Sequence, residues 1–164
     1  MADNPLGDLT RNTRPPLARA GFGVGVVVQD GEGRILLGRH RGGTWELPGG
    51  MVDPTHESVA AAAARELREE TGLLVRDEDV TVFAMLHDVV GGIHRISMAA
   101  LVRVEAAEPR VTEPHLISTW RWTAPDDLPG PLFDPSAQIL AAWRPDLGIG
   151  HPAAHLLRIE SSQA

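Results

Sequence analysis

The 164-residue sequence contains no cysteine, no lysine and no tyrosine. Without cysteine the chain forms no disulfide and no zinc–thiolate site, and it offers no cysteine nucleophile. Without lysine, Schiff-base chemistry by that side chain is excluded, and all 15 cationic side chains are arginine. Without tyrosine, an aromatic side chain that stacks on a ligand must be phenylalanine, tryptophan or histidine.

Long apolar runs and an excess of positive charge are also missing. The longest apolar run near the N-terminus, VGVVV at residues 24–28, is far shorter than the ~20 residues of a membrane-spanning helix. The first ten residues lack the basic-then-apolar pattern of a secretory signal. The net charge of −7 argues against a basic face for a nucleic acid polymer. We therefore expect a cytoplasmic protein that has neither a membrane nor a nucleic acid polymer as partner.

The order of turn signals and apolar segments predicts one mixed α/β domain in layers. Residues 1–17 are expected to form a flexible arm, residues 18–147 the domain and residues 148–164 a C-terminal tail. Strands are predicted at residues 22–28, 34–38, 44–47, 80–86, 94–104 and 116–123, and helices at residues 57–71 and 136–143. The first two strands, joined by DGEG, are expected to form a hairpin. Thr55 is the expected N-cap of the first helix, which would place Glu57 in the first helical turn.

Two glycine-rich stretches precede the first predicted helix. GFGVG at residues 21–25 has the wrong spacing for a dinucleotide loop, and it leads into a strand rather than a helix. We interpret it as a strand whose small residues allow close packing. Gly49 and Gly50 differ, because they lie between an extended segment and a helix, where a turn exposes backbone groups to a ligand.

The first predicted helix has two distinct faces. Apolar side chains recur every four residues and form one stripe: Val59, Ala63 and Leu67. Three carboxylates at positions i, i+3 and i+4 share another face: Glu66, Glu69 and Glu70. Like charges at this spacing repel by about a few tenths of a kcal/mol per pair.

Two interpretations of these carboxylates are open. They form either a solvated acidic face balanced by Arg65 and Arg68, or a site for a divalent cation that removes the repulsion. Their position directly after a glycine turn favours the cation. Carboxylates and a backbone carbonyl are the ligands that Mg²⁺ or Mn²⁺ prefers.

The segment at residues 45–73, WELPGGMVDPTHESVAAAAARELREETGL, resembles the Nudix box, the signature of a family that hydrolyses nucleoside diphosphates linked to another group. The chain matches the family pattern at these positions: Gly50, Glu57, Arg65, Glu66, Leu67, Glu69, Glu70, Gly72 and Leu73. The gap between Gly50 and Glu57 is one residue longer than in the family pattern. Flanking segments from about residue 18 to residue 143 resemble the MutT-type branch of nucleotide triphosphate diphosphatases.

This resemblance implies an α/β/α sandwich with a mixed sheet and a catalytic Mg²⁺ or Mn²⁺. The implied ligands lie on the helix and in the turn before it: Gly49, Glu66, Glu69 and Glu70. Glu66 is the first choice to accept a proton from the attacking water or to position that water. Arg65 is expected to orient the carboxylates by pairing with Glu57.

Two groups of residues are candidates to contact the substrate: two arginines, and side chains that resemble base-pocket positions of the MutT-type branch. Arg39 and Arg41 are candidates to hold the phosphates through charge-assisted hydrogen bonds, with surface charge as the alternative. Four further side chains resemble base-pocket positions of the branch, with core packing as their alternative: Leu47, His94, Leu132 and Phe133.

One more carboxylate completes the candidate site. Glu113 resembles a later glutamate that some family members use near the metal, with an exposed loop carboxylate as the alternative.

The predicted function is metal-dependent hydrolysis of a nucleoside triphosphate, whether unmodified, modified or oxidised, to a nucleoside monophosphate and pyrophosphate. Two alternatives are kept: a hydrolase of another diphosphate, such as a nucleotide sugar or a prenyl diphosphate, and a non-catalytic Nudix domain that senses a nucleotide. The expected partner is a small-molecule nucleotide, and a homodimer is left open.

Overall fold

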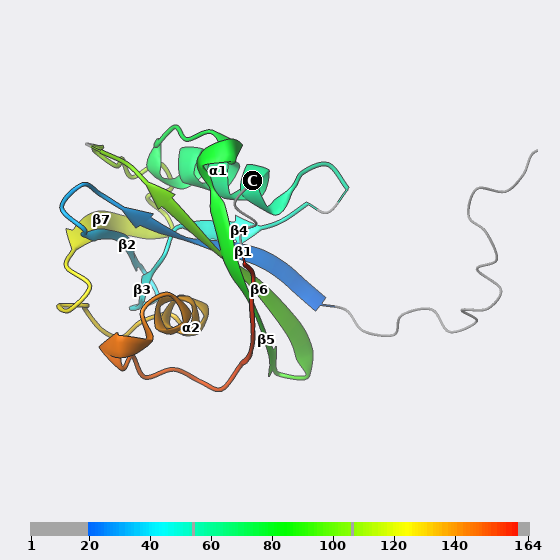
Figure 1. Ribbon diagram of the computed structural model, residues 1–164. Coiled ribbons are helices and arrows are strands. Elements are labelled where there is room, and N and C mark those ends of the chain that lie inside the picture. The colour runs from blue at the N-terminus through cyan, green and yellow to red at the C-terminus, as the bar shows by residue number, and fades with distance from the viewer. Residues whose placement is uncertain (1–19, 54, 106, 161–164) are drawn as a thin grey trace, which may run out of the picture.

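A mixed β-sheet lies between two α-helices in the computed structural model (Figure 1). The structure describes residues 20–160 apart from Pro54 and Ala106, so the expected arm at residues 1–17 lies outside the described residues. Within them the strands are β1 (Ala20–Gln29), β2 (Ile35–His40), β3 (Trp45–Glu46), β4 (Gly49–Met51), β5 (Thr81–Val90), β6 (Ile93–Arg103), β7 (Ile117–Thr123) and β8 (His155–Arg158). The helices are α1 (Val59–Thr71) and α2 (Asp134–Trp143), with short 3₁₀ helices η2 (Asp77–Asp79) and η3 (Pro145–Leu147). These layers confirm the predicted α/β/α sandwich.

The sheet runs in the order β3-β2-β1-β6-β5-β8, with β4 also paired to β1 and β7 to β2. Strands β1 and β6 are parallel, whereas the other paired strands named here are antiparallel. The expected hairpin of β1 and β2 is limited to the contact between Gln29 and Ile35. Strand β2 pairs instead along its length with β7, and near its end with β3. The segment expected as a C-terminal tail contributes β8, which pairs with β5 at the edge of the sheet.

Two apolar cores fill the spaces between the sheet and its helices. Side chains on one strand point alternately to the two faces of a sheet. Accordingly Val26 of β1 packs in the α1 core with Leu67, and Val27 packs in the α2 core with Ile139.

The α-helices of the described part of the chain, with 13 and 10 residues, are too short to span a membrane.

Helix α1 ends where the sequence predicts but begins later. Gly72 ends it with a left-handed φ of 72°, a conformation that glycine adopts without steric cost. The predicted N-cap, Thr55, is wrong: Ser58 caps the helix, and its Oγ accepts a 3.1 Å hydrogen bond from the N–H of Ala61. Thr55 belongs instead to a turn, since its N–H donates to a carboxylate oxygen of Asp53 at 3.0 Å. Glu57 therefore precedes the helix rather than lying in its first turn.

Candidate active site

The glycine turn brings the backbone of β4 against both β1 and helix α1. Gly49 and Gly50 pair with Gly25 and Val24 of β1. A Cβ atom on Gly49 would overlap the carbonyl oxygen of Val24, and one on Gly50 would overlap the carboxylate of Glu66. Gly49 therefore requires glycine, because a side chain there would clash with the backbone of β1, whereas a side chain at Gly50 would displace the carboxylate of Glu66.

Glu70 is the most perturbed carboxylate beside this turn. The N–H of Gly49 donates a 2.9 Å hydrogen bond to Oε2 of Glu70. Burial, reinforced by the charges of Glu66, Glu46 and Glu113, nevertheless raises the pKa of Glu70 to about 8. The surroundings thus disfavour the anionic form of Glu70, and a nearby cation would restore it.

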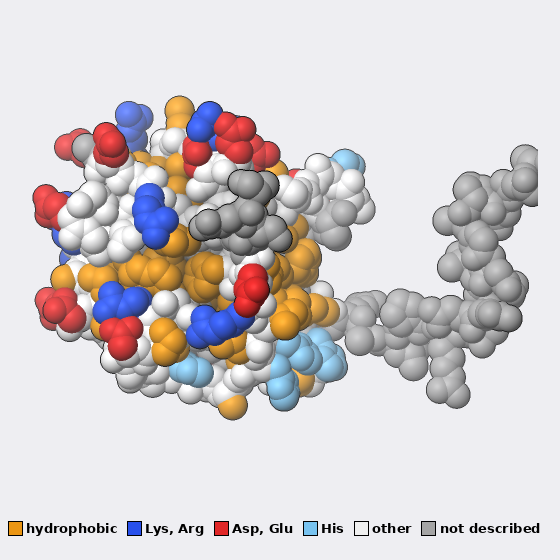
Figure 2. Space-filling model, in the orientation of Figure 1, with side chains coloured by type: hydrophobic (Ala, Val, Ile, Leu, Met, Phe, Trp, Pro, Cys, Tyr) orange, Lys and Arg blue, Asp and Glu red, His pale blue; other side chains and the backbone are white. Residues whose placement is uncertain are grey.

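Glu66 and Glu69 lie on the same face of α1 as the sequence predicts. Burial raises the pKa of Glu66 above its usual range, the charges of Glu69 and Glu57 add to this, and Arg65 opposes it. Nη1 of Arg65 donates to Glu66 at 2.8 Å and to Glu69 at 3.1 Å. Figure 2 shows acidic side chains gathered at the α1 end of this face of the molecule, with arginine among them.

Arg65 and Glu57 form the ion pair that the resemblance implied. Nε and Nη2 of Arg65 donate to the two carboxylate oxygens of Glu57 at 3.0 and 2.8 Å, and Nη2 also donates to the carbonyl of Met51 at 2.9 Å. Hydrogen bonds from Arg65 and from the N–H of Asp53 lower the pKa of Glu57 to about 2. The extra residue between Gly50 and Glu57 is thus accommodated without loss of this contact.

The donor chemistry of these residues fits a divalent cation. No group of three or more His, Asp or Glu side chains in the described part of the chain is already arranged as a metal centre. However, Glu66 and Glu70 both have raised pKa values and both contact the glycine turn. Half-buried, mutually repelling carboxylates beside a turn are oxygen donors of the kind that Mg²⁺ and Mn²⁺ bind.

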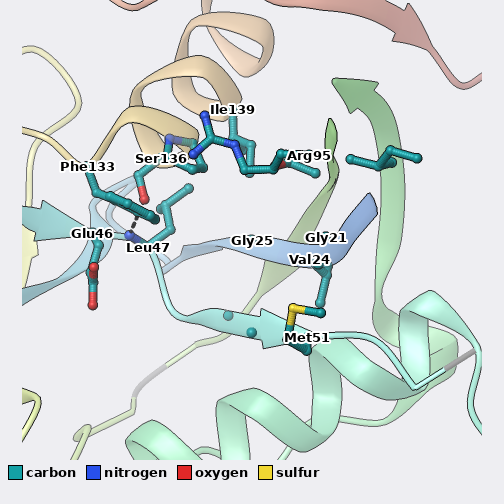
Figure 3. A pocket seen from close by; sticks show the side chains of 16 residues that line it. Gly21, Val24, Gly25, Glu46, Leu47, Met51, Arg95, Phe133, Ser136 and Ile139 are labelled. Atoms are coloured by element: carbon teal, nitrogen blue, oxygen red, sulfur yellow. Dashed lines mark hydrogen bonds between the residues drawn. The ribbon is translucent and has the colours of Figure 1, made fainter. Parts of the chain in front are cut away.

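A cavity of about 360 Å³ extends from the glycine turn across β1 to the start of α2 (Figure 3). Leu47 and Phe133, which were assigned to the base pocket, both line it. Leu47 is held there by a 3.0 Å hydrogen bond from its N–H to Oγ of Ser136. Glu46 lies at the turn end of this cavity, and burial raises its pKa.

Other sequence-predicted substrate residues lie outside the lining of this cavity. Nη1 of Arg39 donates to the carbonyl of Gly43 at 2.5 Å, and Nε of Arg41 donates to the carbonyl of Pro114 at 2.5 Å. The ring of His94 is stacked on that of His87, with 2.8 Å between ring nitrogens.

Sequence reasoning missed two charged residues of the cavity. Glu46 carried a local signal, because it directly precedes the Leu-Pro-Gly-Gly turn. Arg95, the neighbour of His94 on β6, carried none.

Comparison with known proteins identifies related chains. The model of the NUDIX domain matches residues 20–143. A MutT-like protein of Streptomyces ambofaciens is 43% identical over 70 residues, which are 42% of this chain and 44% of that protein. A putative 8-oxo-dGTP diphosphatase 3 of Mycobacterium tuberculosis is 31% identical over 121 residues, which are 70% of this chain and 54% of that protein. The matches span about a third to a half of the length of these curated relatives.

Solved structures show the same fold. The crystal structure of a MutT NUDIX hydrolase from Burkholderia pseudomallei superposes with a TM-score of 0.66 at 33% identity, covering 74% of this chain and 96% of that one. The NUDIX domain of Shewanella oneidensis NrtR, solved with ADP-ribose, has a TM-score of 0.67 at 19% identity, covering 90% of this chain and 99% of that one.

Proposed function

This chain belongs to the NUDIX domain family, and from that membership we propose that it hydrolyses a nucleoside triphosphate, whether unmodified, modified or oxidised, to a nucleoside monophosphate and pyrophosphate. The observation that carries the proposal is the contact of Glu66 and Glu70 with the Gly49–Gly50 turn at one end of an apolar cavity. Acidic side chains beside a largely apolar cavity support a cation and a nucleotide base as the ligands of this proposal. A cytoplasmic location is part of the proposal.

The residues assigned to the cation are the turn and the helix face: Gly49, Glu66, Glu69 and Glu70. When bound, Mg²⁺ or Mn²⁺ offsets the charge of phosphate oxygens and lowers the pKa of a water molecule. Glu113 belongs to the surroundings of this site, since its charge contributes to the raised pKa of Glu70.

Glu66 is assigned as the proton acceptor for the attacking water. Its pKa is raised by burial, which brings a carboxylate closer to the basicity that proton transfer near neutral pH requires. As the water oxygen bonds to phosphorus, its proton passes to Glu66, and the bond to the leaving phosphate oxygen breaks. Arg65 is a positioning residue, because it holds Glu57, Glu66 and Glu69 in fixed relation.

The substrate side is assigned in two parts. Leu47 and Phe133 supply apolar contacts for the base within the cavity. Arg39 and Arg41 keep the assignment to the phosphates, although in this structure they donate to backbone carbonyls of nearby loops.

A substrate panel with product identification tests the proposal. Unmodified, oxidised and methylated nucleoside triphosphates and nucleotide sugars would be incubated with Mg²⁺ or Mn²⁺, and the products separated by ion-exchange chromatography. We expect monophosphate and pyrophosphate in equal amounts from at least one triphosphate. Release of inorganic phosphate and a diphosphate, turnover of nucleotide sugars alone, or binding without turnover would each contradict the proposal.

Variants add a matched comparison to this panel. Glu70→Gln should lose most of the turnover, because it removes an anionic cation ligand. Glu105→Gln makes the same chemical change at an exposed position outside the site and should retain it.

A further inference from the structure

Three glycines leave one face of β1 without side chains. Gly21, Gly23 and Gly25 occupy alternate positions, so they share the face that the next alternate residue, Val27, presents to the α2 core. All three line the cavity. A Cβ atom on Gly25 would lie 2.6 Å from Cδ1 of Ile139, and one on Gly23 would lie 2.9 Å from the carbonyl oxygen of Gly50. The GFGVG stretch therefore forms a floor of the cavity without side chains, and Ile139 and Gly50 pack too closely on Gly25 and Gly23 to admit any.

Arg95 lies at the end of this floor that is remote from the glycine turn. It is the register partner of Gly21 on the parallel strand β6, whereas Gly49 is the partner of Gly25. Four residues of strand separate these two levels, which is about 13 Å at the usual rise per residue. Figure 3 shows the Arg95 side chain extending from β6 toward Ser136 and Ile139 of α2.

A buried network fixes the guanidinium of Arg95. Nε donates to Asp88 at 2.9 Å, and Nη2 donates to the other carboxylate oxygen. The Asp88 side chain is only 9% exposed. Nε2 of the buried Gln138 donates to Asp88 at 2.9 Å and to the carbonyl of Pro152 at 3.2 Å. Asp88 is therefore held from two sides and in turn orients Arg95.

The remaining edge of the guanidinium is available to a ligand. In the described part of the chain the Arg95 side chain donates only to Asp88, so Nη1 has no partner there. Arg95 nevertheless lines the cavity, and its side chain is 23% exposed. The Nη1–Nη2 edge carries hydrogen-bond donors only, so it selects ligand atoms that accept. The charge of Asp88 offsets that of Arg95, which favours a neutral acceptor edge over a phosphate.

We propose that Arg95 is a specificity residue that binds the acceptor edge of a guanine-type base, so that the cavity prefers 6-oxopurine nucleotides to adenine nucleotides. This inference rests on the proposed function. Guanine and hypoxanthine present O6 and N7, two acceptors that match a pair of arginine N–H groups. Adenine presents its N6 amino group in place of O6, which would set donor against donor. Gly21, Gly23 and Phe133 line the same cavity, so the base would lie beside them.

The test compares dITP with dATP, which differ at the edge that Arg95 would contact. We expect wild-type kcat/KM to favour dITP by about tenfold or more, within the range that one bidentate arginine–base contact supplies. Arg95→Met should bring this ratio close to one, mainly by raising KM for dITP. Arg103→Met makes the same change at the exposed end of the same strand and should keep the wild-type ratio.

A second measurement does not depend on the stability of a variant. Wild-type protein should bind 7-deaza-dGTP, which lacks the N7 acceptor, with a KM about fivefold or more above that for dGTP. A wild-type dITP/dATP ratio near one, an unchanged ratio in folded Arg95→Met, or equal KM values for dGTP and 7-deaza-dGTP would overturn the inference.

These outcomes are distinguishable from failure of the proposed function. Hydrolysis without base preference overturns only the role of Arg95. Absence of turnover for every triphosphate overturns the proposed function. In that case the role of Arg95 is decided by calorimetry, which measures the binding of dIMP and dAMP to wild type and to Arg95→Met. Binding of dIMP that is tighter than that of dAMP in wild type, but not in Arg95→Met, would support the inference.

Discussion

The guanidinium of Arg65, on helix α1, donates hydrogen bonds of 3.0 and 2.8 Å to the carboxylate of Glu57, which lies before the helix begins. The same guanidinium contacts Glu66 and Glu69. The Arg65 side chain thus connects the loop after the glycine turn to two carboxylates of the helix. Because these carboxylates carry like charges, their arrangement depends on Arg65.

Replacing Arg65 by methionine should therefore lower both stability and turnover. The change leaves three carboxylates without their shared partner, and we expect the free energy of unfolding to fall by about 1–3 kcal/mol. We expect kcat to fall more than tenfold. Thermal denaturation and steady-state kinetics measure the two effects. Arg68→Met is the control, because Arg68 is 60% exposed and its ion-pair partner Glu69 is 3.9 Å away. Equal effects of the two changes would contradict this account of Arg65.

The extra residue before Glu57 should have little effect on catalysis. His56 is 79% exposed, and its ring contacts only its neighbours Asp53 and Thr55 among the described residues. We expect His56→Ala, and deletion of His56, to change kcat/KM by less than about tenfold, or 1.4 kcal/mol. A larger loss in both variants with the fold intact would show that His56 contacts the substrate.

Glu70→Gln should distinguish the effect of the Glu70 carboxylate on stability without metal from its role in binding the cation. Without metal, the variant should melt at or above the wild-type temperature, because Glu70 is buried among Glu66, Glu46 and Glu113. Added Mg²⁺ should raise the melting temperature of wild type, since a ligand of the native state stabilises it by mass action. Differential scanning fluorimetry with EDTA and with Mg²⁺ measures both. A Mg²⁺-induced rise that persists in Glu70→Gln would count against this residue as a ligand.

Asp88 should contribute pH-dependent stability. Burial alone would raise the pKa of Asp88, but hydrogen bonds from Arg95 and Gln138 outweigh it and lower the pKa. A carboxyl whose folded-state pKa is depressed adds stability above its unfolded pKa of about 4, and this stability is lost as pH falls further.

The measurement is the melting temperature of Asp88→Asn relative to wild type between pH 7 and pH 3. We expect a constant deficit above about pH 5 that shrinks below about pH 4. Asp127→Asn, at an exposed loop position, should show no such trend. A deficit that grows in acid would have the wrong sign for a depressed pKa.

Local sequence signals predicted the helix geometry of the candidate site well. The spacing of Glu66, Glu69 and Glu70 determines that they share a helix face. Gly72 ends the helix, and neither feature depends on how the strands pack. The start of α1 was misjudged, because Asp53 draws Thr55 into a turn and leaves the cap to Ser58. Competition between side-chain and backbone hydrogen-bond acceptors decides at which residue a helix begins, and residue type alone does not show the outcome of that competition.

The far end of the cavity could not be predicted from the sequence. Asp88, Arg95 and Gln138 come from two strands and a helix, and only the pairing of β5 with β6 sets Asp88 opposite Arg95. The sequence pointed to His94 instead of Arg95. Neighbours on a strand face opposite sides of the sheet, so a difference of one residue replaces an imidazole by a guanidinium in the cavity.

The central claim, cation-dependent pyrophosphohydrolysis on the Glu66–Glu70 face, is tested most directly by ³¹P NMR of a nucleoside triphosphate incubated with the protein. With Mg²⁺ we expect pyrophosphate and nucleoside monophosphate to appear one for one with wild type. We expect neither product with EDTA, and at most a small fraction of the wild-type rate with Glu70→Gln. Hydrolysis that persists in EDTA, or a near-wild-type rate of Glu70→Gln at saturating Mg²⁺, would contradict the claim.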